Sequence, residues 1–178
     1  MFFNPFFTTQ DDSEAFLKNT FLKNVTNYSK FQNRDEDVEK KSPRYNMTHA
    51  QRGLAIIFNH LNFAPETNQR ARTGTNIDRN SLINTLSQLN FDVIVHNDKT
   101  KNKILDILDK VSEQDHSNAD CLCIVVLSHG LEGLVFAYDE MYEIEQLWKP
   151  FTADNCPSLA GKPKWFIFQV GRYWLLIK

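Results

Sequence analysis

Two apolar stretches of the chain each end in a residue that could take part in catalysis or binding. Cys121–Leu127 is a run of buried-type residues, and Ser128-His129-Gly130 follows it directly. Phe166–Phe168 ends in Gln169. An imidazole titrates near neutral pH and can transfer a proton. A glycine beside it lets a substrate approach the backbone, whose N–H can stabilise an oxyanion. A lone histidine after a strand is by default a satisfied polar residue, so other motifs must decide its role.

A third feature is the polar loop Arg70–Thr75, which starts eleven residues after the apolar run Leu54–Phe58. Arginine in such a loop is usually a solvated surface charge. Its fork of N–H donors nevertheless fits one carboxylate. Ligands of an open parallel sheet bind beyond the carboxyl ends of its strands. We therefore expect Arg72, His129 and Gln169 to share one cleft.

None of the three cysteines has the features of a nucleophile. Cys121 and Cys123 lie two apart in a strand, so they share a face and are expected to pack as small apolar residues. Cys156 lies in a loop in which nothing suggests a lowered pKa. A zinc site that combines them with His116 would lack a normal ligand spacing. We expect no metal and no cofactor.

An alternation of strands and helices begins near Arg52 and would position these residues. Apolar runs predict strands at 54–58, 91–95, 122–127, 134–138 and 165–168. Apolar stripes predict a helix after Asp78, another capped by Thr100, and a third near 144–151. This order is typical of an α/β fold with a mainly parallel sheet and helices on both faces.

The composition excludes several classes of protein. The net charge is −2 and the pI about 6.2, which argues against a broad nucleic-acid surface. No apolar stretch approaches the roughly 18 residues of a membrane span. Three cysteines without a secretory signal fit a reducing compartment, so we expect a cytoplasmic protein. The stretches Thr8–Ser13 and Asn33–Pro43 are polar and lack sustained periodicity, so we expect residues 1–44 to be a flexible leader with one short helix around Glu14–Val25.

Five motifs, in order, resemble the large subunit of an executioner caspase, and their details are similar to those of insect effector caspases. The resemblance covers roughly residues 44–169. The motifs are Tyr45-Asn46-Met47, Gly53-Leu54-Ala55-Ile56-Ile57-Phe58-Asn59, Arg72-Thr73-Gly74-Thr75-Asn76-Ile77-Asp78, Leu127-Ser128-His129-Gly130 and Leu159-Ala160-Gly161-Lys162-Pro163-Lys164. The resemblance implies a three-layer caspase-like fold, here incomplete because the small subunit is absent. It divides the chain into a leader at 1–44, a catalytic domain at 45–169 and a divergent apolar tail at 170–178.

The resemblance also implies roles for individual residues. His129 would be the general acid and base, and the N–H of Gly130 would help to bind the oxyanion. Arg72 and Gln169 would line the pocket for the aspartate that precedes the cleaved bond. The family reads Gln-Ala-Cys-Arg-Gly where this chain reads Gln169-Val170-Gly171-Arg172-Tyr173. Gly171 therefore stands in place of the nucleophile, and we expect no peptide cleavage.

The function implied is that of an Asp-specific cysteine endopeptidase of apoptosis, a zymogen with protein substrates, for which Asp37 is a candidate processing site. The alternative is a catalytically dead regulator or decoy that binds active caspases. Pairing into a homodimer or into a heterodimer with another caspase is a further possibility that the resemblance implies. We expect neither nucleic-acid nor membrane partners. A nucleotide-binding domain is a weaker alternative, because the Arg72–Thr75 loop has a single glycine.

The residues after Gln169 have three open origins: intron read-through, gene decay and a genuine short isoform. If the domain ends here, we expect the strand at 165–168 to lack the neighbours that a small subunit would supply and to form an exposed sheet edge.

Overall fold

The structure is a computed structural model that describes residues 45–170 and the strand at 173–177. The expected leader with its short helix, Asp37 and Gly171 lie outside the described residues. Residues 45–178 form one compact unit. No helix in the described part of this unit is long and apolar enough to cross a membrane.

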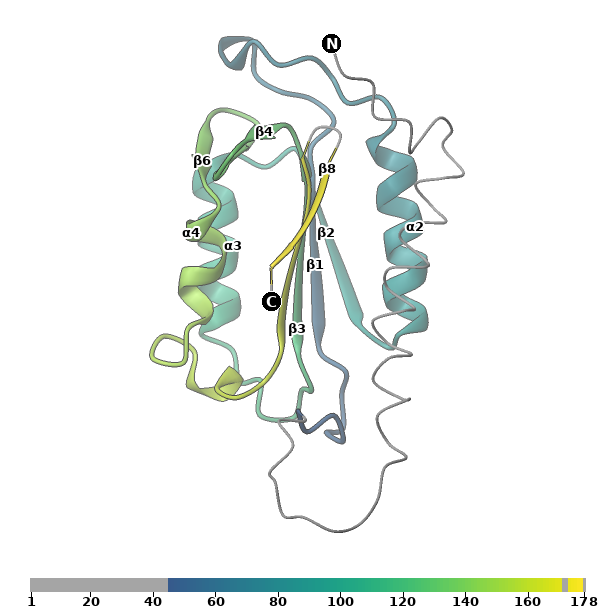
Figure 1. The fold of residues 1–178 in the computed structure, drawn as a ribbon, viewed down its shortest axis with the longest axis vertical. Coiled ribbons are helices and arrows are strands. Elements are labelled where there is room, and N and C mark those ends of the chain that lie inside the picture. Colours follow the sequence, from purple (N-terminus) through teal and green to yellow (C-terminus); the bar gives the residue numbers. More distant parts are fainter. Residues whose placement is uncertain (1–44, 171–172, 178) are drawn as a thin grey trace. The chain divides into compact units, whose positions relative to one another are not determined.

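A five-stranded sheet forms the middle layer, in the order β2-β1-β3-β7-β8 (Figure 1). The first four strands are parallel to one another. The apolar runs 54–58, 91–95, 122–127 and 165–168 form these four strands, within two residues at each end. Their bounds are Leu54–Asn59 for β1, Asp92–Asn97 for β2, Leu122–Ser128 for β3 and Lys164–Val170 for β7.

Helices cover both faces of the sheet, as the sequence predicts. Helix α2 (Thr75–Gln88) lies on one face, and α3 (Lys101–Ser112) and α4 (Glu145–Trp148) lie on the other (Figure 1). The side chain of Thr100 caps α3 and accepts a hydrogen bond from the N–H of Lys103. The helix expected near 144–151 ends early, and a 3-10 turn at Lys149–Phe151 continues it. Pro150 in that turn has no N–H to donate to an α-helix.

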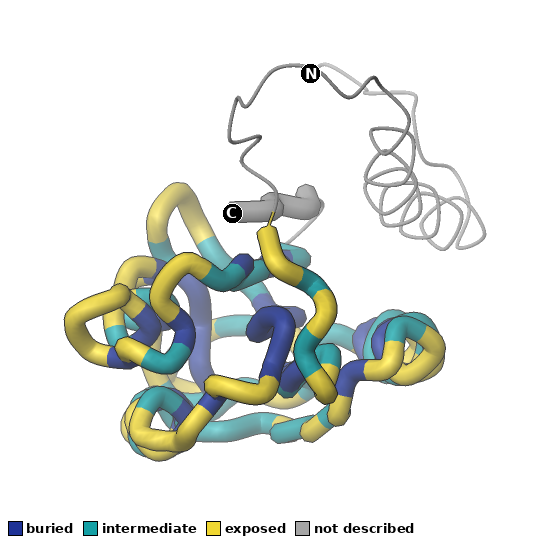
Figure 2. The backbone as a smooth tube through the Cα atoms, turned by 90° about the horizontal axis from the view of Figure 1, so that it is seen from below, coloured by how far each residue is buried: buried dark blue, intermediate teal, exposed yellow. Residues whose placement is uncertain are grey.

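The core lies between the sheet and the α3–α4 layer. Every residue of β3 is buried, which explains its continuous apolar sequence, because a central parallel strand is covered on both faces. Figure 2 shows these buried segments in the interior, with exposed residues in the peripheral loops. The largest fully buried side chains of this core are Ile56, Phe58, Ile104, Leu108, Leu122, Ile124, Leu147, Phe151 and Phe168.

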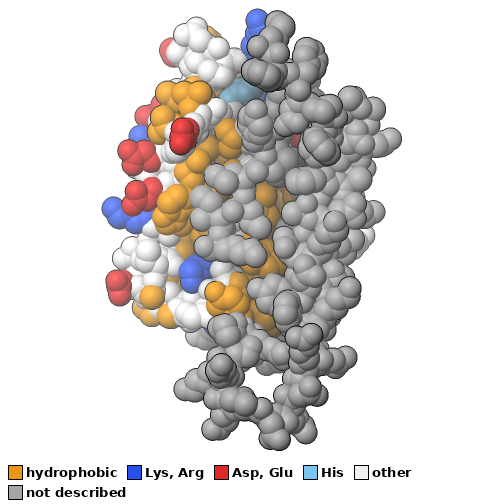
Figure 3. Space-filling model, viewed as in Figure 1, with side chains coloured by type: hydrophobic (Ala, Val, Ile, Leu, Met, Phe, Trp, Pro, Cys, Tyr) orange, Lys and Arg blue, Asp and Glu red, His pale blue; other side chains and the backbone are white. Residues whose placement is uncertain are grey.

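A second, three-stranded sheet follows the central strand directly. It consists of β4 (Gly130–Leu131), β5 (Leu134–Phe136) and β6 (Met141–Glu143). Only its middle strand was expected from the sequence. The side chains of Leu131 and Met141 in this sheet are exposed to solvent. Charged side chains line the outer side of the helical layer beside it (Figure 3).

The expected exposed edge at 165–168 is wrong. Strand β8 (Tyr173–Ile177) pairs antiparallel with β7, from Val170 opposite Tyr173 to Phe166 opposite Ile177. Aromatic and branched residues favour strands, and an unpaired edge offers them a row of backbone donors and acceptors. The apolar tail therefore covers the edge that we expected it to leave open.

Candidate active site

The strand register places the ends of three strands at one level. Asn59 at the end of β1 lies opposite Leu127 of β3, and Leu127 lies opposite Gln169 of β7. Ser128 then pairs with Val170, so His129 follows at the same edge. This is the carboxyl edge of the parallel strands, where such sheets bind ligands.

The loop after β1 brings Arg72 to this edge. Its Nη2 donates a hydrogen bond to Oε1 of Gln169. Its Nη1 donates to the hydroxyl of Thr75 at 2.6 Å and to the carbonyl of His60 at 3.3 Å. Burial lowers the pKa of the Arg72 guanidinium to about 10, so the group remains a cation at neutral pH. The structure thus brings Arg72 and Gln169 together, while their role as a substrate pocket stays a prediction.

The ring of His129 is fixed on the same loop. Its Nε2 lies 2.8 Å from the carbonyl oxygen of Arg70. A carbonyl only accepts hydrogen bonds, so Nε2 carries the proton and Nδ1 carries the lone pair. The ring of Phe63 packs against the imidazole, with 5.0 Å between ring centroids. His129 therefore presents the tautomer whose Nδ1 can accept a proton from a nucleophile.

Gly130 occupies a position with no room for a side chain. A Cβ atom there would lie 2.4 Å from the carbonyl oxygen of Leu134 and 2.4 Å from Cγ1 of Val170. The absence of a side chain keeps the small sheet close to the end of β7. The role of the Gly130 N–H in binding an oxyanion stays a prediction.

The cysteines lie away from this edge. Cys121 and Cys123 stand at the amino end of β3, and Cys156 precedes a 3-10 turn; all three are buried. Burial raises the pKa of the Cys121 thiol to about 12 and also raises the pKa of Cys123. Neither thiol therefore forms a thiolate near neutral pH. Both pack as the small apolar residues that the sequence predicts.

Three polar residues at this edge had no role in the sequence-based prediction: Asn59, His60 and Thr75. All three are buried. Asn59 and His60 lie at the carboxyl end of β1, so the rule that identified His129 could have identified them too. The sequence-based prediction missed them because the apolar run before them looks like an ordinary buried strand.

His60 is the most unusual of them. Its side chain has zero exposure, and neither ring nitrogen has a hydrogen-bond partner among the described residues. Its backbone N–H donates to Leu127 O at 2.9 Å, and its ring stacks on Phe63. Burial lowers the pKa of His60 to about 4.

The buried imidazole predicts a loss of stability in acid. The pKa of about 4 lies below the unfolded value of 6.5, so the unfolded chain binds the proton first as the pH falls. The contribution of neutral His60 is complete above pH 6.5 and is lost between pH 6.5 and 4. We expect a loss of about 3 kcal/mol in the free energy of unfolding, measured by urea denaturation. The variant His60→Asn should lack this component, and an unchanged pH slope in that variant would contradict the assignment.

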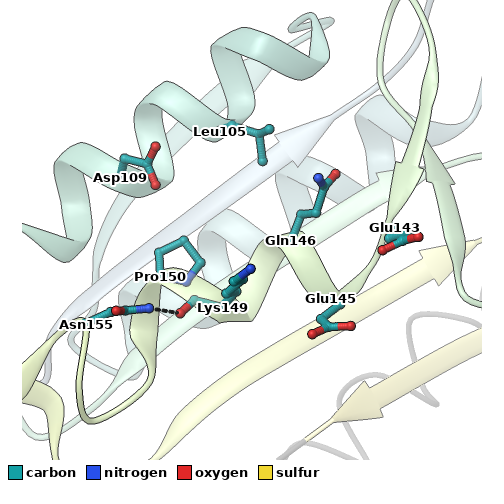
Figure 4. A pocket seen from close by; sticks show the side chains of 8 residues that line it. All are labelled: Leu105, Asp109, Glu143, Glu145, Gln146, Lys149, Pro150 and Asn155. Carbon is teal, nitrogen blue, oxygen red and sulfur yellow. Dashed lines mark hydrogen bonds between the residues drawn. The ribbon is translucent and has the colours of Figure 1, made fainter.

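A separate hollow of about 390 Å³ lies between α3 and α4 (Figure 4). Asn155 donates a hydrogen bond to the carbonyl of Lys149 at its rim. Carboxylates and one ammonium group surround it, together with Leu105 and Pro150, and neither histidine nor cysteine lines it. The hollow is therefore distinct from the edge that holds Arg72 and His129.

Comparison with protein-family models matches residues 52–173 to the caspase domain. The chain is 46% identical over 132 residues to caspase-1 of Spodoptera frugiperda. The aligned segment covers 74% of this chain and 44% of that protein. It is 43% identical over 132 residues to caspase drICE of Drosophila melanogaster, of which 39% is covered. The chain thus spans less than half the length of these relatives.

Solved structures show the same likeness in three dimensions. The crystal structure of caspase-1 from Spodoptera frugiperda superposes with a TM-score of 0.71 at 44% sequence identity. The superposition covers 76% of this chain and 54% of that one. The superposed parts of the two chains therefore share one α/β fold.

Proposed function

Because the chain belongs to the caspase family, we propose that it forms the large-subunit part of a cysteine endopeptidase that cleaves proteins after aspartate during apoptosis. In this proposal it acts in the cytoplasm, it derives from a zymogen, and its substrates are proteins. Residues 1–44 are its leader, and 45–169 its catalytic portion.

The observation that carries the proposal is the contact between Arg72 and Gln169. The bonds to His60, Thr75 and Gln169 use three of the five N–H groups of the Arg72 guanidinium, and the proposal assigns the other two to a ligand. A partly buried guanidinium suits one short carboxylate, which it can bind through two parallel N–H groups. A neutral isostere would leave those donors without a charged partner, so the site discriminates strongly.

His129 supplies proton transfer in the proposed reaction. Its Nδ1 takes the proton of a thiol, and the resulting thiolate attacks the carbonyl carbon of the peptide bond. The oxyanion that forms accepts a hydrogen bond from the N–H of Gly130. The departing amine takes the proton back from His129, and water then hydrolyses the thioester. Residue 171 is glycine, so this chain has no thiol at that position. We therefore expect binding without cleavage.

Binding of an acetylated tetrapeptide that ends in aspartate amide tests the proposal. Isothermal titration should show at least tenfold weaker binding when asparagine replaces the aspartate. Arg72→Lys should remove this preference, because an ammonium group cannot reproduce the fork of donors. Arg70→Lys is the matched control, since its contact with His129 comes from the backbone. Equal affinity of the parent chain for the two peptides would refute the proposed pocket.

The second candidate is a regulator or decoy that binds active caspases as a catalytically dead partner. Gly171 favours it, because a chain that binds without cleaving can occupy a partner. Mixing the chain with active Spodoptera caspase-1 should then give a heterodimer in analytical ultracentrifugation and lower that enzyme's rate. Two separate species and an unchanged rate would exclude this function.

A further inference from the structure

A row of hydrogen bonds leads from Arg72 into the interior of the domain. Nη1 of Arg72 donates to Oγ1 of Thr75 at 2.6 Å. Oγ1 of Thr75 donates to Oδ1 of Asn59 at 2.7 Å. Thr75 and Asn59 are both buried, with exposed fractions of 2% and 0%. The guanidinium at the edge of the sheet is thus attached to the last residue of β1.

The amide of Asn59 has one defined orientation. Its Nδ2 donates to Oδ1 of Asn76 at 3.1 Å and to Oδ1 of Asn97 at 3.0 Å. These two bonds use both of its N–H groups, so Oδ1 is left to accept. The two partners come from α2 and from β2. Asn59 is therefore held by elements outside the loop that carries Arg72.

This orientation decides what the Thr75 hydroxyl does. A hydroxyl has one proton, and Thr75 donates it to Oδ1 of Asn59. Its oxygen lone pairs must then point toward donors, and Nη1 of Arg72 is the donor at 2.6 Å. Each group in the row has a fixed direction, and the row ends in an acceptor aimed at the guanidinium.

Thr75 is also the first residue of α2, but its hydroxyl does not cap that helix. Gly74 occupies the cap position, and no side chain makes a cap hydrogen bond there. The other contact of Nη1, with the His60 carbonyl, is longer at 3.3 Å. The hydroxyl is thus the closest acceptor that fixes Nη1, whereas Gln169 fixes Nη2.

We propose that Thr75 and Asn59 are positioning residues that set the plane of the Arg72 guanidinium and thereby determine selectivity for a substrate aspartate. This inference rests on the proposed function, because it assigns Arg72 to the carboxylate. Three bonds, two on Nη1 and one on Nη2, hold the plane of the fork, and in this proposal the remaining N–H groups face the ligand. Without the Thr75 hydroxyl, the guanidinium keeps its charge but loses the shorter of its two bonds on Nη1, so its plane is held less firmly.

The variants Thr75→Val and Thr75→Ser separate the hydroxyl from the shape of the side chain. Valine matches threonine in size and lacks the hydroxyl, while serine keeps it. The first measurement is the ratio of the dissociation constants for the tetrapeptides that end in asparagine and aspartate. Thr75→Val should lower this ratio at least tenfold and leave affinity for the asparagine peptide within twofold. Thr75→Ser should stay within threefold of the parent chain.

The second measurement needs no ligand. Nitrogen-15 NMR of the Arg72 guanidinium should show slow rotation about its Cζ–Nη bonds in the parent chain and in Thr75→Ser. Thr75→Val should show averaged Nη1 signals, while Nη2, held by Gln169, should rotate as in the parent chain. Unchanged, slow rotation of Nη1 in Thr75→Val would overturn the positioning role, whichever peptide binds. Restricted rotation without any preference for aspartate would instead reject the proposed pocket and leave the positioning intact.

Discussion

Replacing Gly53 with alanine should abolish cooperative folding of the domain. Gly53 has φ +122°, a backbone conformation that L-residues with a side chain rarely adopt. A Cβ atom there would lie 1.9 Å from the carbonyl oxygen of Cys121. The obstacle is backbone at the start of β3, held by a bond from the Cys121 N–H to Arg52 O. Neither of these two backbone segments can move without separating β1 from β3. We therefore expect the free energy of unfolding to fall by more than about 4 kcal/mol.

Gly133→Ala is the matched control. Gly133 also has positive φ, at +74°, but no heavy atom lies within 4 Å of its virtual Cβ. This variant should lose only the free energy that an L-residue costs at positive φ, about 1 kcal/mol of stability. Urea unfolding followed by circular dichroism should give a normal transition for Gly133→Ala and none for Gly53→Ala. Similar midpoints for the two variants would show that the close approach of the two backbones does not limit folding.

The contrast between these glycines indicates which parts of the fold the sequence can reveal. Strands β1 and β3 are visible as apolar runs because burial on both faces demands apolar side chains. The closeness of Gly53 to Cys121 is a contact between residues 68 positions apart (121 − 53), and a single glycine has no pattern that predicts it. The pairing of β8 was missed for a related reason, since an apolar tail does not show which edge it will cover.

In the candidate site, too, some features follow from a sequence pattern and others arise only from contacts in the folded chain. The rule that ligands lie beyond strand ends placed Arg72 near Gln169, which the structure joins by a hydrogen bond, and placed His129 at the same edge of the sheet. It did not predict the carbonyl of Arg70 as the partner of His129, because every residue has a carbonyl. It also missed the Asn59–Thr75 row, since a buried amide at the end of an apolar strand shows its partners only after the chain has folded.

Introducing a thiol by Gly171→Cys should create a reactive nucleophile. His129 directly follows the last residue of β3 that pairs with β7, and the resemblance to caspases puts the nucleophile at position 171. In the neutral imidazole, the bond from Nε2–H of His129 to the Arg70 carbonyl leaves the lone pair on Nδ1. A base in that position removes the thiol proton, and a thiolate paired with an imidazolium has a lowered pKa. We expect one covalent adduct per chain from a peptidyl fluoromethyl ketone that ends in aspartate, detected by mass spectrometry.

The double variant His129→Ala/Gly171→Cys isolates the contribution of the base. It should react about 10²-fold more slowly, the lower end of what a positioned general base provides. The parent chain is the control for other thiols and should stay unlabelled, because Cys121 and Cys123 are buried and their pKa values are raised. Equal rates in the single and double variants would mean that His129 does not activate residue 171. Labelling of the parent chain would mean that a cysteine which the structure buries is in fact accessible.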